Sequence, residues 1–388
     1  MKNKIIILML IFLLTGCYGY QELNEKAIVR GISIDFEKNQ YVVNYMVSNA
    51  NVSNGKNSET NPQTALLEGK GDTISEAIAE INLLSPKKTY IGHMLILVIS
   101  DELAKNGVAT PTDYFFRNTQ SKKSFYFVLS KGNKAKEILS ILSPLNTFPA
   151  ENITENLATS DLTEGFISNI TFTEFISDIL SDGVDPVLNG IKMIGSSESG
   201  SKKENLESSE IKNYIKIDTL GIFKKDKLIG FASKTVSKGI NILNQKSDNF
   251  QIETILNDKK VVFRFKDIKV KKEVSFDDKI TFKFKVIGES EIEETNGNFN
   301  ISKEKDIKLL KESLDKKLMA ILTETINYSK ETKADFLGLG NYIYLNHYKK
   351  WKKIKDNFDL KNIVVKLEVN NNLLRNENTD EGTRKVHE

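Results

Sequence analysis

The sequence holds one thiol, and its position suggests what that thiol does. Cys17 is the only cysteine in 388 residues. Two lysines precede an unbroken apolar run over residues 5–14, and two small residues then lead to Cys17. A basic start, a short apolar run and small residues before a cleavage point are typical of a secretory signal, and about ten apolar residues are too few for a permanent membrane span. We therefore expect residues 1–16 to be a signal peptide.

The four residues that end this segment point to lipid attachment. Leu14-Thr15-Gly16-Cys17 resembles the lipobox of bacterial lipoproteins. The resemblance implies a diacylglyceryl group on the Cys17 thiol, cleavage directly before Cys17 and acylation of the freed amine. Two acyl chains give stable anchoring, whereas one chain is marginal. We expect the mature protein to be tethered to the outer face of the cytoplasmic membrane. A plain secretory leader with an incidental cysteine is the alternative.

Other residue patterns with recognisable chemistry are scarce. The three histidines, His93, His347 and His387, are far apart and lack the close spacing of zinc ligands. The sequence contains no Gly-x-Ser-x-Gly elbow and no phosphate loop ending in Gly-Lys-Ser/Thr. We expect no catalytic residue, no metal and no cofactor apart from the covalent lipid on Cys17, and thus a protein that is not an enzyme.

Charge and length limit the partners and the organisation. The net charge is +3, and it falls to +1 when the first 16 residues leave with their two lysines. A nearly neutral chain has no basic excess to favour nucleic acid, so we expect no nucleic-acid partner. About 370 residues remain after cleavage, more than one core usually supports, which predicts two or three domains.

In the first half of the mature chain, strand patterns alternate with helix patterns. Residues 27–34 and 41–47 are β-branched and aromatic and flank a hairpin connection. Capping boxes at Thr73 and Thr171, each with Glu three residues later, predict helix starts. The continuous apolar run at 95–99 predicts a strand buried on both faces.

The second half contains longer alternating patterns. We expect a hairpin from residues 214–223 and 227–231, followed by an amphipathic helix. Strands near 261–265 and 280–286 alternate apolar and polar residues, so that each has one solvated face. A long helix over about 303–330 and a closing strand at 363–369 follow.

These patterns predict an α+β or mixed α/β fold of three domains with mixed sheets and packed helices, none of them a doubly wound nucleotide-binding fold. The polar stretch at 196–209 suggests an exposed loop or linker. After the signal peptide we expect an N-terminal α/β domain at 17–193, a small middle α+β domain at 194–248, a C-terminal α+β domain with the long helix at 249–374, and a disordered tail at 375–388.

Five stretches of the mature chain stand in an order that resembles a known family. They are GISID at 31–35, YIGHM at 90–94, DPVL at 185–188, GIFKKDKLIG at 221–230 and ADFLGLG at 334–340. Together they resemble the Ger(x)C lipoproteins, the C subunits of spore germinant receptors in endospore-forming bacteria. Tyr18 and Gly19 depart from the family, which often has tryptophan and an acidic residue there.

The resemblance implies a site of action and partners. It implies three mixed domains on the outer leaflet of the spore's inner membrane, in a complex with a partly embedded A subunit and a transporter-like B subunit. That complex responds to small nutrient germinants and starts exit from dormancy, and the C subunit has no known catalytic activity. Any link of this subunit to the germinant could be indirect.

Two loops are candidate partner-binding sites. Gly92 and His93 lead into the predicted buried strand, and loops on rigid scaffolds often carry function; alternatively Gly92 only permits a tight path and His93 only bonds the backbone. The second loop follows the long helix, and its aromatic residues are of the kind enriched at interfaces; alternatively they cover the underside of the sheet. Its candidate residues are Asp335, Phe336, Gly338, Gly340, His347 and Trp351.

The predicted function is that of a membrane-anchored, non-enzymatic receptor subunit. Two alternatives stay open: a solute-binding lipoprotein that delivers a small molecule to a permease, and a cell-wall enzyme. Two equal lobes joined by a hinge would favour the solute-binding protein, whereas the sequence predicts three unequal units.

Overall fold

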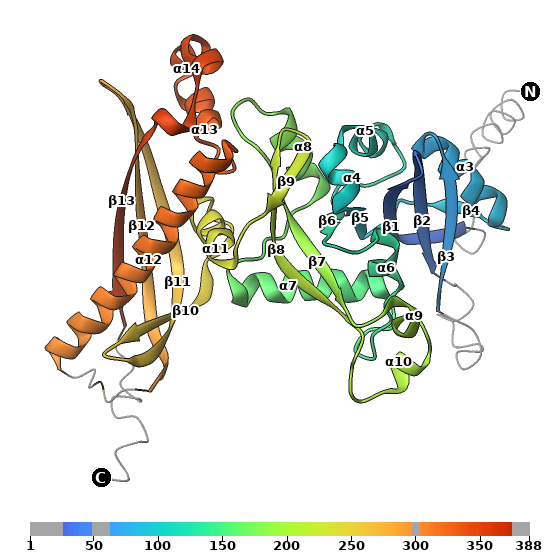
Figure 1. Cartoon of the computed structure of the whole chain (residues 1–388), viewed down its shortest axis with the longest axis horizontal. Helices are drawn as coiled ribbons and strands as arrows, with labels where there is room; N and C mark the ends of the chain where they lie inside the picture. Colours follow the sequence, from blue (N-terminus) through green and yellow to red (C-terminus); the bar gives the residue numbers. More distant parts are fainter. Residues whose placement is uncertain (1–25, 49–62, 297–298, 300–302, 375–388) are drawn as a thin grey trace, which may run out of the picture.

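The computed structural model describes residues 26–48, 63–296, 299 and 303–374. Cys17, the predicted signal peptide and the predicted tail at 375–388 lie outside the described residues. The described chain forms two sheets that follow one another along the long axis of the molecule (Figure 1). None of its helices is both long enough and apolar enough to span a bilayer.

The first sheet has parallel strands at its centre and antiparallel strands at its edges. Its order is β3-β2-β1-β5-β6-β7-β8-β9, with β4 also paired to β1. Neighbours among β1, β5, β6 and β7 run parallel. The strands are β1 (Lys26–Glu37), β2 (Gln40–Ser48), β3 (Thr64–Gly71), β4 (Lys88–Tyr90), β5 (Ile96–Ser100), β6 (Tyr126–Ser130), β7 (Val187–Ile194), β8 (Tyr214–Lys224) and β9 (Lys227–Phe231).

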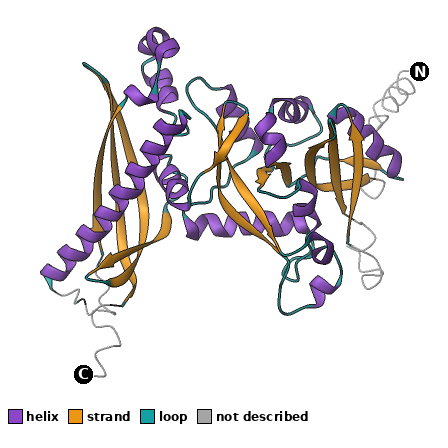
Figure 2. Cartoon of the chain, viewed as in Figure 1, coloured by secondary structure: helices purple, strands orange, loops and turns teal. Residues whose placement is uncertain are grey.

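Helices cover both faces of this sheet, as Figure 2 shows. All five residues of β5 are buried, and they alternate between the two sides: Ile96 and Val98 belong to one apolar cluster, Leu97 and Ile99 to the other. The prediction of a strand buried on both faces is therefore confirmed. The helices are α3 (Ile74–Leu84), α4 (Asp101–Asn106), α5 (Ala109–Arg117), α6 (Ala135–Ser140), α7 (Pro149–Glu164), α8 (Phe172–Leu180), α9 (Ser197–Gly200) and α10 (Glu204–Glu207).

Local sequence signals set several of these elements. Both predicted capping boxes form: Thr73 and Thr171 each accept from the amide of the Glu three residues on, and that Glu accepts from the cap residue's amide. The β1–β2 hairpin turns at Lys38 and Asn39, which both have positive φ. A two-residue turn whose twist matches that of the strands requires positive φ at these positions.

The second sheet is amphipathic and carries the long helix on one face. It has the order β10-β11-β12-β13, with β12 and β13 parallel and the other pairs antiparallel. Its inward side chains include five fully buried phenylalanines, so the predicted alternation is confirmed. Its elements are β10 (Asn249–Leu256), β11 (Lys259–Phe276), β12 (Ile280–Thr295), α12 (Glu304–Thr332), α13 (Leu339–Asn346), α14 (Tyr348–Ile354), the 3-10 turns Lys355–Asn357 and Leu360–Asn362, and β13 (Val364–Leu373).

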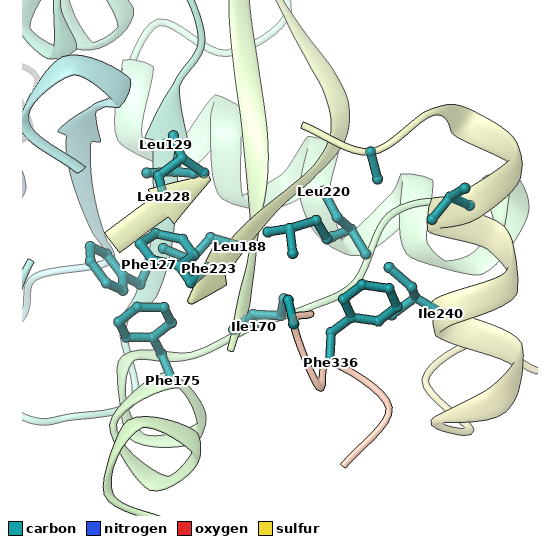
Figure 3. Packing of buried hydrophobic residues seen from close by; sticks show 14 of the residues in the cluster. Phe127, Leu129, Ile170, Phe175, Leu188, Leu220, Phe223, Leu228, Ile240 and Phe336 are labelled. Atoms are coloured by element: carbon teal, nitrogen blue, oxygen red, sulfur yellow. The ribbon is translucent and has the colours of Figure 1, made fainter. Parts of the chain in front are cut away.

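Helix α11 (Lys234–Leu243) joins the two sheets into one body. The side-chain amide of Asn241 donates to the carbonyls of Gly165 and Ile167, beside the first sheet. The side-chain amide of Asn244 donates to the carbonyl of Phe336, in the second unit, which comprises the second sheet and its helices. A single apolar cluster runs from the first sheet through Ile240 to Phe336 (Figure 3). The mixed α+β fold predicted from the sequence is confirmed, and the described chain contains no nucleotide-binding fold.

Of the two predicted internal domain boundaries, one lies within the first sheet and the other at the start of the second. Residue 194 ends β7, which pairs along its length with β8, so the predicted domains 17–193 and 194–248 share one sheet. The polar segment between these strands is an excursion that carries α9 and α10. Residue 249, by contrast, begins β10 and thus the second sheet.

The contact between α11 and α12 yields a test with a clear sign. A Cβ at Gly239 would overlap Oγ1 of the buried Thr325. Helix propensity alone predicts that Gly239→Ala stabilises the protein by about 1 kcal/mol, whereas overpacking predicts a loss of roughly 1–3 kcal/mol. We expect a loss in chemical denaturation, partly recovered when Thr325→Ala is combined with it. A stabilised Gly239→Ala variant would show that the two helices are not in close contact.

Candidate functional site

The first predicted loop lies at the surface, beside the start of β1. His93 is exposed and its ring stands edge-on to Tyr90, 5.6 Å between centroids. Gly92 is buried, and a Cβ there would overlap the Tyr90 ring and hydroxyl. The glycine therefore serves a close approach, while the histidine is free to meet a partner.

The second predicted loop is mainly internal. Asp335 is 5 % exposed, and its carboxylate accepts from the amides of Leu339, at 2.9 Å, and Gly340, at 2.8 Å. These are the first amides of α13, whose N-cap is Gly338, with φ +59° and no side chain to offer. Asp335 thus supplies the helix cap from three residues upstream, where an anion also meets the positive end of the helix.

Asp335 is bound to a second buried carboxylate, Asp185. The Asp335 amide donates to Asp185 Oδ2 at 2.7 Å, and the Asp185 amide donates back to the Asp335 carbonyl at 3.0 Å. Asp185 also accepts from Lys224 Nζ and from the Lys225 amide, both at 2.8 Å. We call Asp185, Lys224 and Asp335 the junction clasp, since they tie the β8–β9 hairpin of the first sheet to the loop after α12.

Two glycines let the backbones meet beside the clasp. The Asn341 amide donates to the Gly183 carbonyl at 2.7 Å. A Cβ on Gly183 would lie 2.5 Å from the Gly340 carbonyl carbon, and Gly183 has φ +74°. Any side chain at either position would force the two segments apart.

Two aromatic residues predicted as partner contacts, Phe336 and Trp351, are buried. Phe336 is 2 % exposed, and Trp351 is 5 % exposed with its ring 5.2 Å from that of Phe358. Both lie in the apolar cluster and thus belong to the core rather than to an exposed surface. Gly340 is also buried and Gly338 partly so, which leaves His347, beside the ring of Phe276, as the exposed member of the predicted set.

A cavity of about 470 Å³ lies next to the clasp. Helix α8 contributes Glu174 and Asp178, and β11 contributes Lys272. The lining also includes the C-terminal end of α11, residues between Phe336 and Leu345, and residues near Ser168 and Asp185. We call this space the junction cavity. Its charged residues were not predicted as a site, because the two acids of α8 are nearly 100 residues from Lys272 in the sequence and no local pattern links them.

The pKa values of two carboxylates on α8 are shifted in opposite directions. Burial raises the pKa of Asp178 to about 6, with Lys246 opposing the rise and Glu174 adding to it. Burial also acts to raise the pKa of Glu174, but hydrogen bonds from Lys246 and Thr171 lower it below its ordinary value. At the pH at which Asp178 begins to bind a proton, Glu174 therefore still carries its negative charge.

The clasp and Lys272 are affected by the same low-dielectric surroundings. Burial raises the pKa of Asp335 to about 6, although the hydrogen bonds donated by the backbone amides of Gly340 and Leu339 lower it. Burial lowers the pKa of Lys272, whose ammonium donates to the Leu337 carbonyl at 3.0 Å and lies over the rings of Phe284 and Tyr342. Hydrogen bonds to the backbone hold the Asp335 carboxylate and the Lys272 ammonium in fixed positions.

The cavity offers hydrogen bonds rather than a nucleophile with its base. Ser168 Oγ donates to Asn241 Oδ1 at 2.5 Å, and an amide oxygen cannot accept the proton as a base would. No set of three or more His, Cys, Asp or Glu residues within the described ranges could hold a metal ion. The arrangement suits reversible binding or the fixing of one unit against the other.

Comparison with known proteins decides the family. The model described as "Spore germination protein N-terminal domain" matches residues 19–193, and that described as "Spore germination B3/GerAC like, C-terminal" matches residues 218–377. The chain belongs to the Ger(x)C family of spore germination proteins. The sequence prediction of this family is confirmed, and with it a role in spore germination.

Individual relatives of this Ger(x)C protein agree along nearly the whole chain. Spore germination protein KC of Bacillus subtilis is 25% identical over 375 residues, which cover 92% of this chain and 90% of that protein. Spore germination protein B3 of the same organism is 23% identical over 357 residues, 89% of each. The crystal structure of the GerBC protein matches with a TM-score of 0.54 at 17% identity, over 91% of this chain and 100% of that one, which shows the shared fold.

The two carboxylates of α8 should shift stability with pH in opposite directions. Because the pKa of Asp178 is raised on folding, its contribution to stability is present below about pH 4 and is lost as pH rises through about 6. We expect Asp178→Asn to be more stable than the wild type at pH 7.5 by on the order of 1–2 kcal/mol, with the difference vanishing at pH 4.

Glu174→Gln is the matched control on the same helix. The pKa of Glu174 is lowered, so its contribution is present at neutral pH and is lost as pH falls. This variant should be slightly less stable at pH 7.5, slightly because the side chain is 41% exposed. Denaturation curves from pH 4 to 7.5 measure both, and equal behaviour of the two variants would contradict the assignment.

Proposed function

We propose that this chain is the lipid-anchored C subunit of a nutrient germinant receptor, on the outer face of the spore's inner membrane. One observation carries the proposal: the family match begins at residue 19, two residues after Cys17, and covers residues 19–193 and 218–377. The lipobox-like residues therefore stand directly ahead of the germination domain, where a lipid anchor would tether it.

The partners follow from the family. The relatives include spore germination proteins A3, B3 and KC, which supports membership of a receptor complex. We infer that the partners are the membrane-bound A and B subunits, and that this chain acts without catalysis. Its part is to present a rigid extracytoplasmic body to them, because the clasp and α11 hold both sheets in one arrangement.

The junction cavity gives some support to a second function, capture of a small solute. Solute capture between lobes needs a hinge that lets them close. Here the units share one apolar cluster and are joined by the buried clasp. The structure thus favours a fixed junction, and any ligand of the cavity would have to enter without closure of the two units.

Replacement of Cys17 tests the anchor and the function together. Cys17→Ala removes the sole thiol acceptor, so the chain should leave the inner-membrane fraction, since without two acyl chains stable anchoring is lost. Spores with this variant should respond to nutrients as poorly as spores that lack the protein. Both should still respond to a cationic surfactant, which perturbs the membrane without a receptor.

Mass spectrometry of the mature wild-type N-terminus is the direct readout. The expected product begins at Cys17 and carries the diacylglyceryl and amine-linked acyl groups. An unmodified Cys17 would refute the anchor, and normal nutrient germination of spores without the protein would refute the receptor role.

A further inference from the structure

Two adjacent leucines at the end of α3 are exposed to solvent. Leu83 is 87% exposed and Leu84 is 59% exposed, and Pro86 is exposed as well. Single exposed leucines are common on protein surfaces. Here two exposed leucines are adjacent in the sequence, and the exposed Pro86 follows Leu84 by two positions, so three apolar side chains meet solvent within four residues.

Two lysines stand opposite each other where β4, the strand that follows α3, pairs with β1. Lys88 is exposed and begins β4, where it pairs with Lys26 at the start of β1. The Lys26 ammonium lies 4.8 Å from the centre of the Tyr90 ring. Glu80, three residues before Leu83 in the helix, accepts from the Lys70 amide at 2.9 Å. We call Leu83, Leu84, Pro86, Lys26 and Lys88 the α3 corner.

The α3 corner is placed where the described chain begins. In Figure 1, α3 packs on β3 and β2 while β4 pairs with β1, all at the end of the molecule remote from the second sheet. Lys26 follows Cys17 by nine residues, and nine residues span at most about 30 Å when fully extended. A lipid on Cys17 therefore keeps this corner within about one bilayer thickness of the membrane surface.

We propose that the α3 corner rests on the outer leaflet of the bilayer, with the two leucines in the interface and the lysines at anionic headgroups. Leucines beside lysines are the composition of interfacial anchors, because the apolar groups enter the acyl boundary while the ammonium groups stay among phosphates. The contact fixes which way the first sheet faces relative to the membrane. It rests on the proposed anchoring at Cys17.

The lone cysteine makes this contact directly measurable. Once Cys17 is lipidated, Leu83→Cys introduces the only free thiol of the chain, which can carry an environment-sensitive NBD fluorophore. The lipidated variant is reconstituted into vesicles of phosphatidylcholine and phosphatidylglycerol. We expect emission shifted to shorter wavelength and strong quenching by lipids with a nitroxide near the headgroup.

The matched control is Leu345→Cys in α13, which is similarly exposed, at 70%, but belongs to the second unit. Its fluorophore should report water and escape the nitroxide. In a Lys26→Glu/Lys88→Glu background, the shift of the Leu83→Cys label should shrink in anionic vesicles, because the headgroup attraction is reversed. Identical emission at the two labelled positions would overturn the proposal.

Flotation of the same vesicles separates this proposal from the anchor. Protein that fails to float shows that anchoring at Cys17 is wrong, whereas protein that floats with an aqueous signal at Leu83→Cys shows that only the corner contact is wrong. If the label is shielded in isolated spore membranes but aqueous in vesicles, a protein surface covers the corner, and the lipid proposal is overturned.

Discussion

Two buried aspartates fix the contact between the first sheet and the loop that follows α12. Asp185 and Asp335 come from different units, and each accepts hydrogen bonds on both of its carboxylate oxygens. Close like charges are unfavourable in a low dielectric, yet without them the first amides of α13 and the Lys225 amide would lose their buried acceptors, which is costly. The clasp is therefore held by the need to satisfy backbone donors, and that need fixes the relative position of the two sheets.

The rest of the architecture builds on this fixed junction. Gly183 and Gly340 allow the contact, α11 supplies the side chains that bridge to both sheets, and the apolar cluster fills the space between. A contact made at the first sheet thus determines the position of the second. Under the proposed tethering at Cys17, the orientation at the membrane and the contacts with partners would both be set by this one body.

The sequence predicted what depends on local patterns. The β5 run, the two capping boxes and the alternating strands of the second sheet were all visible in short windows and are confirmed. The pairing of β7 with β8 across the polar segment was not visible, because a strand partner leaves no local mark. The same limit hid Asp178 and Lys272, which face one cavity from distant segments.

Residue type also left the role of the second loop open. Phe336 and Trp351 are as suitable for a core as for an interface, since in both places they bury a large apolar area. Only their three-dimensional surroundings, with Trp351 against Phe358 and Phe336 against α11, place them inside. His93 and His347, by contrast, remain exposed and stay candidate contacts for a partner.

Purification of the lipidated protein from spore inner membranes in mild detergent tests the central claim most directly. A lipid-anchored subunit of a germinant receptor should be recovered with two polytopic membrane proteins in constant ratio, and these should be identified as the A and B subunits. Recovery of the protein alone, or together with a solute permease, would contradict the account.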